Sequence, residues 1–244
     1  MIVKTQTGRG EKIHVMVDGA YTATTTRTFW FSLGVSEGSD LTEEELTELL
    51  EKISHQRLYE KALDLLSARD YSRKELSDKL IRKTLEKQRL DAKQDDNRDF
   101  GLTEASFSTV ELSSQKKDMD ALRQETSEIC DKLEELGLLN DERYARTYLQ
   151  ELIRNKHLSE RGLQAELMKK GVPRSIISNV LEETELDPME PLSQLLNGKY
   201  RSRDLTDERQ KQRTVNALLR LGYRYGEVME AIDRHVRMAA EYDC

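Results

Sequence analysis

The chain has 244 residues, of which 35% are charged and only 6% are aromatic. Only 3 prolines and 12 glycines interrupt it, and Ala, Glu, Lys, Leu and Arg dominate its composition, so we expect a mainly α-helical protein. It lacks any apolar run of the roughly 18 residues that a membrane helix requires, and its first residues lack the apolar core of a secretion signal. These features predict a cytoplasmic protein without membrane contact.

Residues that could carry catalysis or bind a metal are few and scattered. Cys130 and Cys244 have no His or Cys neighbour at ligand spacing, and the four histidines share no such spacing. The sequence contains no phosphate-binding loop, nucleophile elbow or His-Glu-x-x-His motif. We therefore expect a protein that is not an enzyme and that uses no disulfide, metal or other cofactor.

Charge is distributed unevenly along the chain. The net charge of −7 hides acidic segments at 1–53 and 91–125, each with a net charge of −4, and basic segments at 54–90 and 197–238, each with +4. Because the basic segments can form a surface of their own, the total charge does not exclude a polyanionic partner.

The first 33 residues have the composition of a β-sheet. Apolar residues alternate with polar ones at 13–17, an Asp-Gly turn sequence follows, and the next stretch, YTATTTRTFWF, is rich in β-branched and aromatic residues. We expect a small β-hairpin or three-stranded flap, with Trp30 packed onto the first helices. Together with one capped helix, this flap makes up the predicted N-terminal part, 1–53.

Two copies of the Ser/Thr-x-x-Glu capping box mark helix starts. Thr42 is followed by Glu45, and Ser72 by Glu75, and a leucine comes next in each copy. In this motif the hydroxyl accepts a hydrogen bond from the backbone N–H of the glutamate, whose side chain reaches back to the capping residue. Helices are predicted to begin at both positions.

Three segments of the chain align with one another, namely YSRKELSDKLIRK, LSERGLQAELMKKG and KQRTVNALLRLG. The alignment makes three leucine or valine pairs equivalent: Leu76/Leu80, Leu163/Leu167 and Val215/Leu219. Gly171 and Gly222 end the second and third copies, and a further short helix follows each. A period near 50 residues predicts tandem three-helix repeats.

The predicted repeats occupy 54–136, 137–186 and 187–244. The first repeat contains an acidic insert at about 86–124, which is low in large apolar residues and is therefore expected to be flexible. A single repeat cannot bury both sides of its helices, so neighbouring repeats are expected to stack.

A helix of the middle repeat is predicted to separate an apolar face from a basic one. Gly137 ends the preceding helix and Asn140 caps the next one. At 100° per residue, Tyr144 and Tyr148 share one half of the circumference with the aliphatic residues. The other half carries Arg143, Arg146 and Arg154.

Basic side chains from all three repeats form the predicted binding surface, because stacking aligns equivalent faces of successive repeats. The candidate contact residues are Arg73, Lys74, Lys79, Arg82, Lys83, Arg143, Arg146, Arg154, Lys156, Arg161, Lys169, Lys170, Arg174, Arg213, Arg220 and Arg224.

Four blocks resemble the RecX family in the order in which they occur there: ALDLLSARDYSRKELSDKL from residue 62, LEELGLLNDERYARTYLQELIRNK from residue 133, LQAELMKKGV from residue 163 and LLRLGYRYGEVMEAI from residue 218. The block GLLNDERYA, at 137–145, is the most characteristic. Three features depart from the family pattern: Thr84 stands where a glycine is common, His157 and Leu158 replace a more basic turn, and the acidic insert has no counterpart.

The resemblance implies three tandem three-helix repeats in a curved array. It also implies a bacterial regulator that binds the filament of the RecA recombinase on single-stranded DNA and inhibits ATP hydrolysis and strand exchange, acting as a monomer in recombination and DNA repair. The alternative is a helical-repeat adaptor that binds only protein, in which the tyrosines are core and the arginines serve solubility. The salt dependence of binding to single-stranded DNA distinguishes the two.

Overall fold

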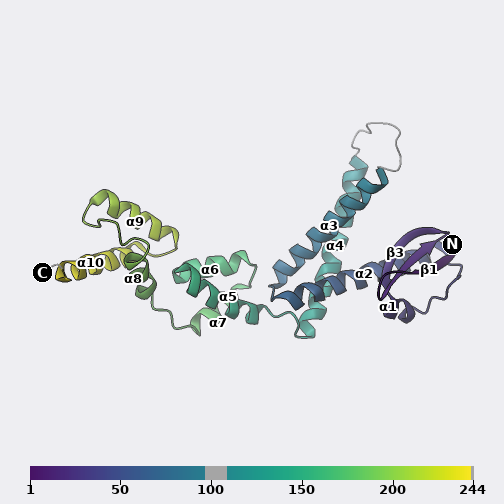
Figure 1. Cartoon of the computed structure of the whole chain (residues 1–244), viewed down its shortest axis with the longest axis horizontal. Coiled ribbons are helices and arrows are strands. Elements are labelled where there is room, and N and C mark those ends of the chain that lie inside the picture. The colour runs from purple at the N-terminus through teal and green to yellow at the C-terminus, as the bar shows by residue number, and fades with distance from the viewer. Residues whose placement is uncertain (97–108, 243–244) are drawn as a thin grey trace. The chain divides into compact units, whose positions relative to one another are not determined.

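The computed structural model of the chain describes residues 1–96 and 109–242, and it divides into two compact units. The first unit comprises Met1–Arg69 and Leu76–Leu138, and the second comprises Asp70–Glu75 and Leu139–Cys244. The fold is mainly helical, with a small sheet at its N-terminus, as predicted (Figure 1). Within the described residues, no helix is long and apolar enough to span a membrane.

The N-terminal sheet has three antiparallel strands in the order β1 (Val3–Thr7), β2 (Lys12–Val17) and β3 (Ala20–Thr26). Asp18 and Gly19 join β2 to β3 with positive φ angles of 49° and 84°, as two-residue hairpin turns require. The three-stranded flap is thus confirmed. One face of the sheet is buried by alternate side chains, and the other is open to solvent.

The expected position of Trp30 is confirmed, but its local structure differs from a strand. Residues Arg27–Ser32 form a short helix, α1, because the Thr26 side chain accepts a hydrogen bond from Phe29 N–H and caps it. Trp30 is 4% exposed and packs in one cluster with the sheet and with leucines of the next helix. Residues 21–31 have a composition typical of strands, yet their last part is helical, because the cap at Thr26 starts a helix there.

Helix α2 (Glu43–Ala68) begins at the predicted capping box, in which both reciprocal hydrogen bonds are present between Thr42 and Glu45. Helix α3 (Arg73–Asp96) begins at the second predicted site, where the Ser72 hydroxyl accepts from Glu75 N–H at 3.2 Å. Helix α4 (Thr109–Glu135) lies against α2. There His55 Nδ1 lies 3.5 Å from the Glu125 carboxylate.

Most of the predicted flexible insert is helical. Residues 86–96 continue α3 and residues 109–124 belong to α4, whereas 97–108 lie outside the described residues. The second and third repeats end the corresponding helix at Gly171 and Gly222, which adopt φ of 79° and 94°. Thr84 takes this place in the first repeat and stays helical, its hydroxyl donating to Leu80 O at 3.0 Å. Without a glycine to end it, α3 runs on.

The second unit contains two three-helix groups with separate cores (Figure 1). The first group comprises α5 (Asp141–Lys156), α6 (Glu160–Lys169) and α7 (Arg174–Glu182), and the second comprises α8 (Met189–Asn197), α9 (Glu208–Arg220) and α10 (Tyr225–Tyr242). The predicted cap of α5 is confirmed, with Asn140 Oδ1 accepting from Arg143 N–H at 2.8 Å.

The predicted register of the third repeat is wrong by one residue. Leu219 is 38% exposed, whereas Leu218 is fully buried and precedes Gly222 by the same four positions that separate Leu167 from Gly171. Thr214, also fully buried, is then the counterpart of Leu163. The sequence alignment favoured leucine over threonine, but the buried hydroxyl is satisfied by Gln210 O and by the Arg203 guanidinium, each at 3.0 Å.

Candidate nucleic-acid interface

Adjacent repeats of the second unit meet at a joint built from a serine and a glycine. The Ser159 backbone N–H and hydroxyl donate to Leu221 O at 3.2 and 3.3 Å. A Cβ at Gly222 would lie 2.5 Å from Ser159 Oγ, and one at Gly162 would lie 2.4 Å from Leu221 O. The two backbones can approach this closely only because neither glycine has a side chain.

The same joint recurs one repeat earlier within this unit. Ser72 matches Ser159, and its hydroxyl donates to Lys170 O, the residue before Gly171. A Cβ at Gly171 would lie 2.4 Å from Lys74 Cβ. The two joints within the second unit therefore have a specific chemical basis, of which the sequence showed only the two glycines. The serines at equivalent positions are the signal by which the joint could have been found.

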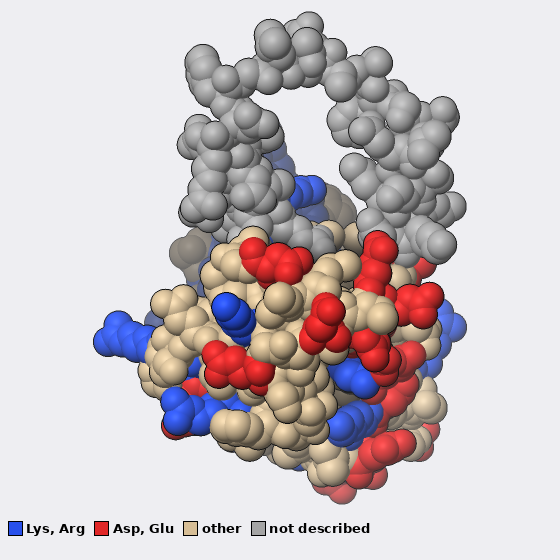
Figure 2. Space-filling model, turned by 90° about the vertical axis from the view of Figure 1, so that its right-hand side faces the viewer, with Lys and Arg blue, Asp and Glu red and all other residues tan. Residues whose placement is uncertain are grey.

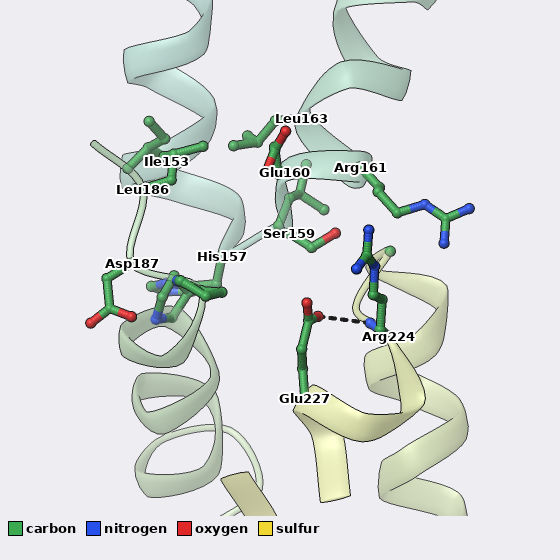
Figure 3. Close-up of a pocket in the computed structure, with 14 residues that line it drawn as sticks. Ile153, His157, Ser159, Glu160, Arg161, Leu163, Leu186, Asp187, Arg224 and Glu227 are labelled. Atoms are coloured by element: carbon green, nitrogen blue, oxygen red, sulfur yellow. Dashed lines mark hydrogen bonds between the residues drawn. The ribbon is translucent and has the colours of Figure 1, made fainter. Parts of the chain in front are cut away.

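Each joint presents a cation two residues after its serine. Lys74 and Arg161 occupy this position and are both exposed. At the second joint Arg224 follows Gly222, and Figure 3 shows the Arg161 and Arg224 side chains on the same side of a shared pocket. No carboxylate among the described residues forms an ion pair with any of these three cations.

The pocket at the second joint has a volume of about 230 Å³ and a mixed polar lining. Besides the two arginines it contains three carboxylates, Glu160, Asp187 and Glu227. One of them is already engaged, since Glu227 Oε2 accepts from Arg224 N–H at 2.8 Å. Because the carboxylates outnumber the arginines, the pocket itself does not favour an anion. The exposed guanidinium groups of Arg161 and Arg224 are the part suited to phosphate.

The predicted basic face of α5 is partly neutralised. Arg146 bridges Glu142, at 2.6 Å, and Glu183 at the end of α7. These hydrogen bonds raise the pKa of Arg146, with Glu183 the larger cause. Arg143 forms a pair with Asp70 at 3.0 Å. Arg146 therefore ties α5 to the end of α7, and Arg143 ties α5 to the segment Asp70–Glu75 of the same unit.

Three of the predicted lysines are also paired. The Glu166 carboxylate forms ion pairs with Lys156 at 2.8 Å and with Lys169 at 2.6 Å. Their hydrogen bonds, that of Lys156 first, lower the pKa of Glu166 to about 2. Lys170 lies 3.2 Å from Glu75, whose other oxygen accepts from the Tyr144 hydroxyl.

The remaining candidates fall into three groups. Arg73 is half-buried, and its backbone N–H donates to the Asp141 carboxylate at 2.7 Å. Burial raises the pKa of the Asp141 carboxyl. Lys79, Arg82 and Lys83 belong to the first unit, whereas the other candidates belong to the second. Four further arginines of the second unit are exposed and form no ion pair with a described carboxylate: Arg154, Arg174, Arg213 and Arg220.

The tyrosines of the second unit differ in burial. Tyr144 and Tyr223 are buried, and Tyr148 stacks on Tyr144 with ring centroids 5.7 Å apart. Tyr223 donates to His157 O at 2.9 Å, and burial raises its pKa to about 12. Tyr225 is 60% exposed and is therefore not part of the core.

Comparison with known families matches two parts of this architecture. Residues 59–87 match the first three-helix domain of RecX, and residues 140–181 match its second three-helix domain. Both matches are to domains of one family, RecX, and they follow each other in the family's order along the chain. The second match contains α5, α6 and most of α7, and thus the serine of the second joint.

Curated RecX relatives extend this similarity over most of the chain. The regulatory protein RecX of Caldanaerobacter subterraneus subsp. tengcongensis is 27% identical over 174 residues, which are 71% of this chain and 70% of that protein. The regulatory protein RecX of Serratia proteamaculans is 29% identical over 178 residues, which are 72% of this chain and 96% of that protein. A crystal structure of a regulatory protein RecX has the same fold, with a TM-score of 0.59 at 18% identity, over 95% of this chain and 97% of that one.

Proposed function

We propose that the protein is a cytoplasmic, monomeric regulator that binds a RecA-type recombinase and its filament on single-stranded DNA. It inhibits ATP hydrolysis and recombination and is not itself an enzyme. Similarity to curated regulatory proteins of the RecX family supports the regulatory role. The DNA contact is argued from the cations of the second unit.

The observation that carries this proposal is the recurrence of an exposed, unpaired cation at each repeat joint. Lys74 and Arg161 occupy equivalent positions, and Arg224 adds a second guanidinium at the second joint. Cations repeated at the spacing of stacked repeats suit a polymer of regularly spaced phosphates. Such contacts give sequence-independent binding, and each contributes about 0.7 to the salt dependence of binding to a single strand.

The test is the ATPase activity of RecA on single-stranded DNA, titrated with this protein. We expect inhibition by the unaltered protein and weaker inhibition by Arg161→Glu/Arg224→Glu. Direct binding to a single strand should show a salt slope lower by about 1.4 in the variant, since two phosphate contacts are lost. Arg234→Glu/Arg237→Glu is the matched control, because it reverses two exposed charges on α10 away from both joints.

One observation favours the alternative of a protein-only adaptor. Five of the predicted contact residues are engaged by carboxylates of the second unit, namely Arg143, Arg146, Lys156, Lys169 and Lys170. If binding to single-stranded DNA is absent at low salt or does not depend on salt, the adaptor function holds and the DNA contact is rejected.

A further inference from the structure

The solvent-exposed face of the N-terminal sheet carries an aromatic cluster that the proposed function does not use. Because side chains alternate between the two faces of a strand, Val3, Ile13 and Val15 lie on the face that packs against Trp30 and the leucines of α2. The opposite face presents two rows of side chains across the three strands. Register pairs Lys4 with Met16 and Met16 with Tyr21, and it pairs Gln6 with His14 and His14 with Thr24.

Two rings of this face are held in fixed positions. His14 Nδ1 and the Tyr21 hydroxyl both hydrogen-bond to Thr24 Oγ1, at 2.8 and 2.9 Å. The two rings meet edge to face with their centroids 5.9 Å apart. A Cβ at Gly8 would lie 2.7 Å from His14 Nε2, so glycine there makes room for the imidazole. His14 Nδ1 and the Tyr21 hydroxyl are thus engaged by Thr24, while the Tyr21 side chain remains 59% exposed.

This geometry differs from a solvated sheet face in one respect. An exposed tyrosine on an ordinary sheet surface is free to change rotamer, whereas Tyr21 is restrained by Thr24 and by His14. A ring that is fixed before binding loses little conformational entropy when a flat ligand stacks on it.

The charge of the sheet suits an anionic ligand. The three strands contain Lys4 and Lys12 but no Asp or Glu, although the whole chain has 46 acidic against 39 basic side chains. The nearby carboxylates lie off the strands. Glu11 and Asp18 are in the turns, Asp40 pairs with the N-terminal amine at 2.7 Å, and Glu60 on α2 accepts from Thr26 at 3.5 Å. On the face of the molecule in Figure 2, uncharged residues are interspersed with basic and acidic side chains, and acidic side chains are most frequent toward one edge.

We propose that this sheet face binds single-stranded nucleic acid by stacking bases on Tyr21 and His14, while Lys4 and Lys12 attract the phosphates. Stacking on aromatic side chains combined with basic residues is the general means of binding single strands without sequence preference. A protein partner fits less well, because the centres of protein interfaces are depleted in charge, whereas this face has Lys4 in one row and Lys12 beside the other. The site lies outside the repeats and goes beyond the function proposed for them.

The experiment compares two probes with the full-length protein: an oligodeoxythymidylate, and a strand of the same length without bases. We expect Tyr21→Ala to bind the oligodeoxythymidylate about fivefold or more weakly, the loss that one stacked base implies. Binding to the abasic strand should not change. Tyr21→Phe should keep most of the affinity, because the ring remains and only the hydrogen bond to Thr24 is lost.

Phe31→Ala is the matched control, since Phe31 is 73% exposed in the same unit but lies on α1. The proposal is overturned if Tyr21→Ala binds both probes like the unaltered protein, if it weakens both equally, or if Phe31→Ala has the same effect. The two proposals fail in distinguishable ways. Loss of the joint arginines weakens both probes, because both carry phosphates, whereas loss of Tyr21 affects only the probe that has bases.

Discussion

Replacing Gly222 by alanine should separate the two repeats of the second unit at their joint. Gly222 has φ of 94°, and alanine in this left-handed region costs about 1–2 kcal/mol. The added methyl group would also lie 2.5 Å from Ser159 Oγ and 2.7 Å from Gly162 N. Such overpacking against backbone costs about 1–3 kcal/mol. The total of about 2–5 kcal/mol is a large fraction of the 5–15 kcal/mol typical of a folded domain.

Gly137→Ala is the matched control. Gly137 has φ of 68° but no atom within 4 Å of a built Cβ, so its substitution should cost only the conformational part. Urea unfolding followed by circular dichroism measures both losses. The single tryptophan, Trp30, lies in the first unit, so its fluorescence should report an unchanged transition in Gly222→Ala. If Gly222→Ala is no less stable than Gly137→Ala, the joint does not hold the repeats together.

Two further changes test the electrostatics and the buried polar group of the second unit. The pKa of Glu166 is lowered from its ordinary 4.5 to about 2, so the stabilisation by its ion pairs is present above pH 4.5 and is lost as the pH falls toward 2. Glu166→Gln should therefore reduce the fall in melting temperature between pH 4.5 and pH 2. An unchanged fall in this variant would contradict the prediction. Thr214→Val should lower the free energy of unfolding by about 1–3 kcal/mol, because it leaves the Arg203 guanidinium without its acceptor. Thr147→Val, which removes only a bond to Arg143 O within its own helix, is the control and should cost less.

Local signals in the sequence predicted the ends of helices reliably. Thr42, Ser72 and Asn140 all cap as expected, and Gly171 and Gly222 adopt the left-handed conformation that ends a helix. These features depend on a few neighbouring residues, whose hydrogen bonds and steric limits are the same in any fold. The extension of α3 follows the same logic, because no glycine interrupts it at Thr84.

Which Lys and Arg side chains pair with carboxylates could not be predicted in this way. Arg146 lies on the exposed side of α5, as the helical wheel indicates, yet its charge is engaged by Glu183 from α7, 37 positions away. Leu219 was placed in the core because threonine is a poor substitute for leucine, and only the partners of Thr214 explain its burial.

The sequence by itself therefore determined the helical class, the capped starts, the three-stranded flap and the repeat period, because these follow from short-range propensity and spacing. Only the tertiary structure decided which cations remain without a carboxylate and how the repeats meet. Both depend on pairs such as Ser159 and Leu221, or Ser72 and Lys170, that are 62 and 98 positions apart. Likewise, the sequence placed Tyr21 in a strand, but only the pairing of β2 with β3 set its ring beside His14 on the open face.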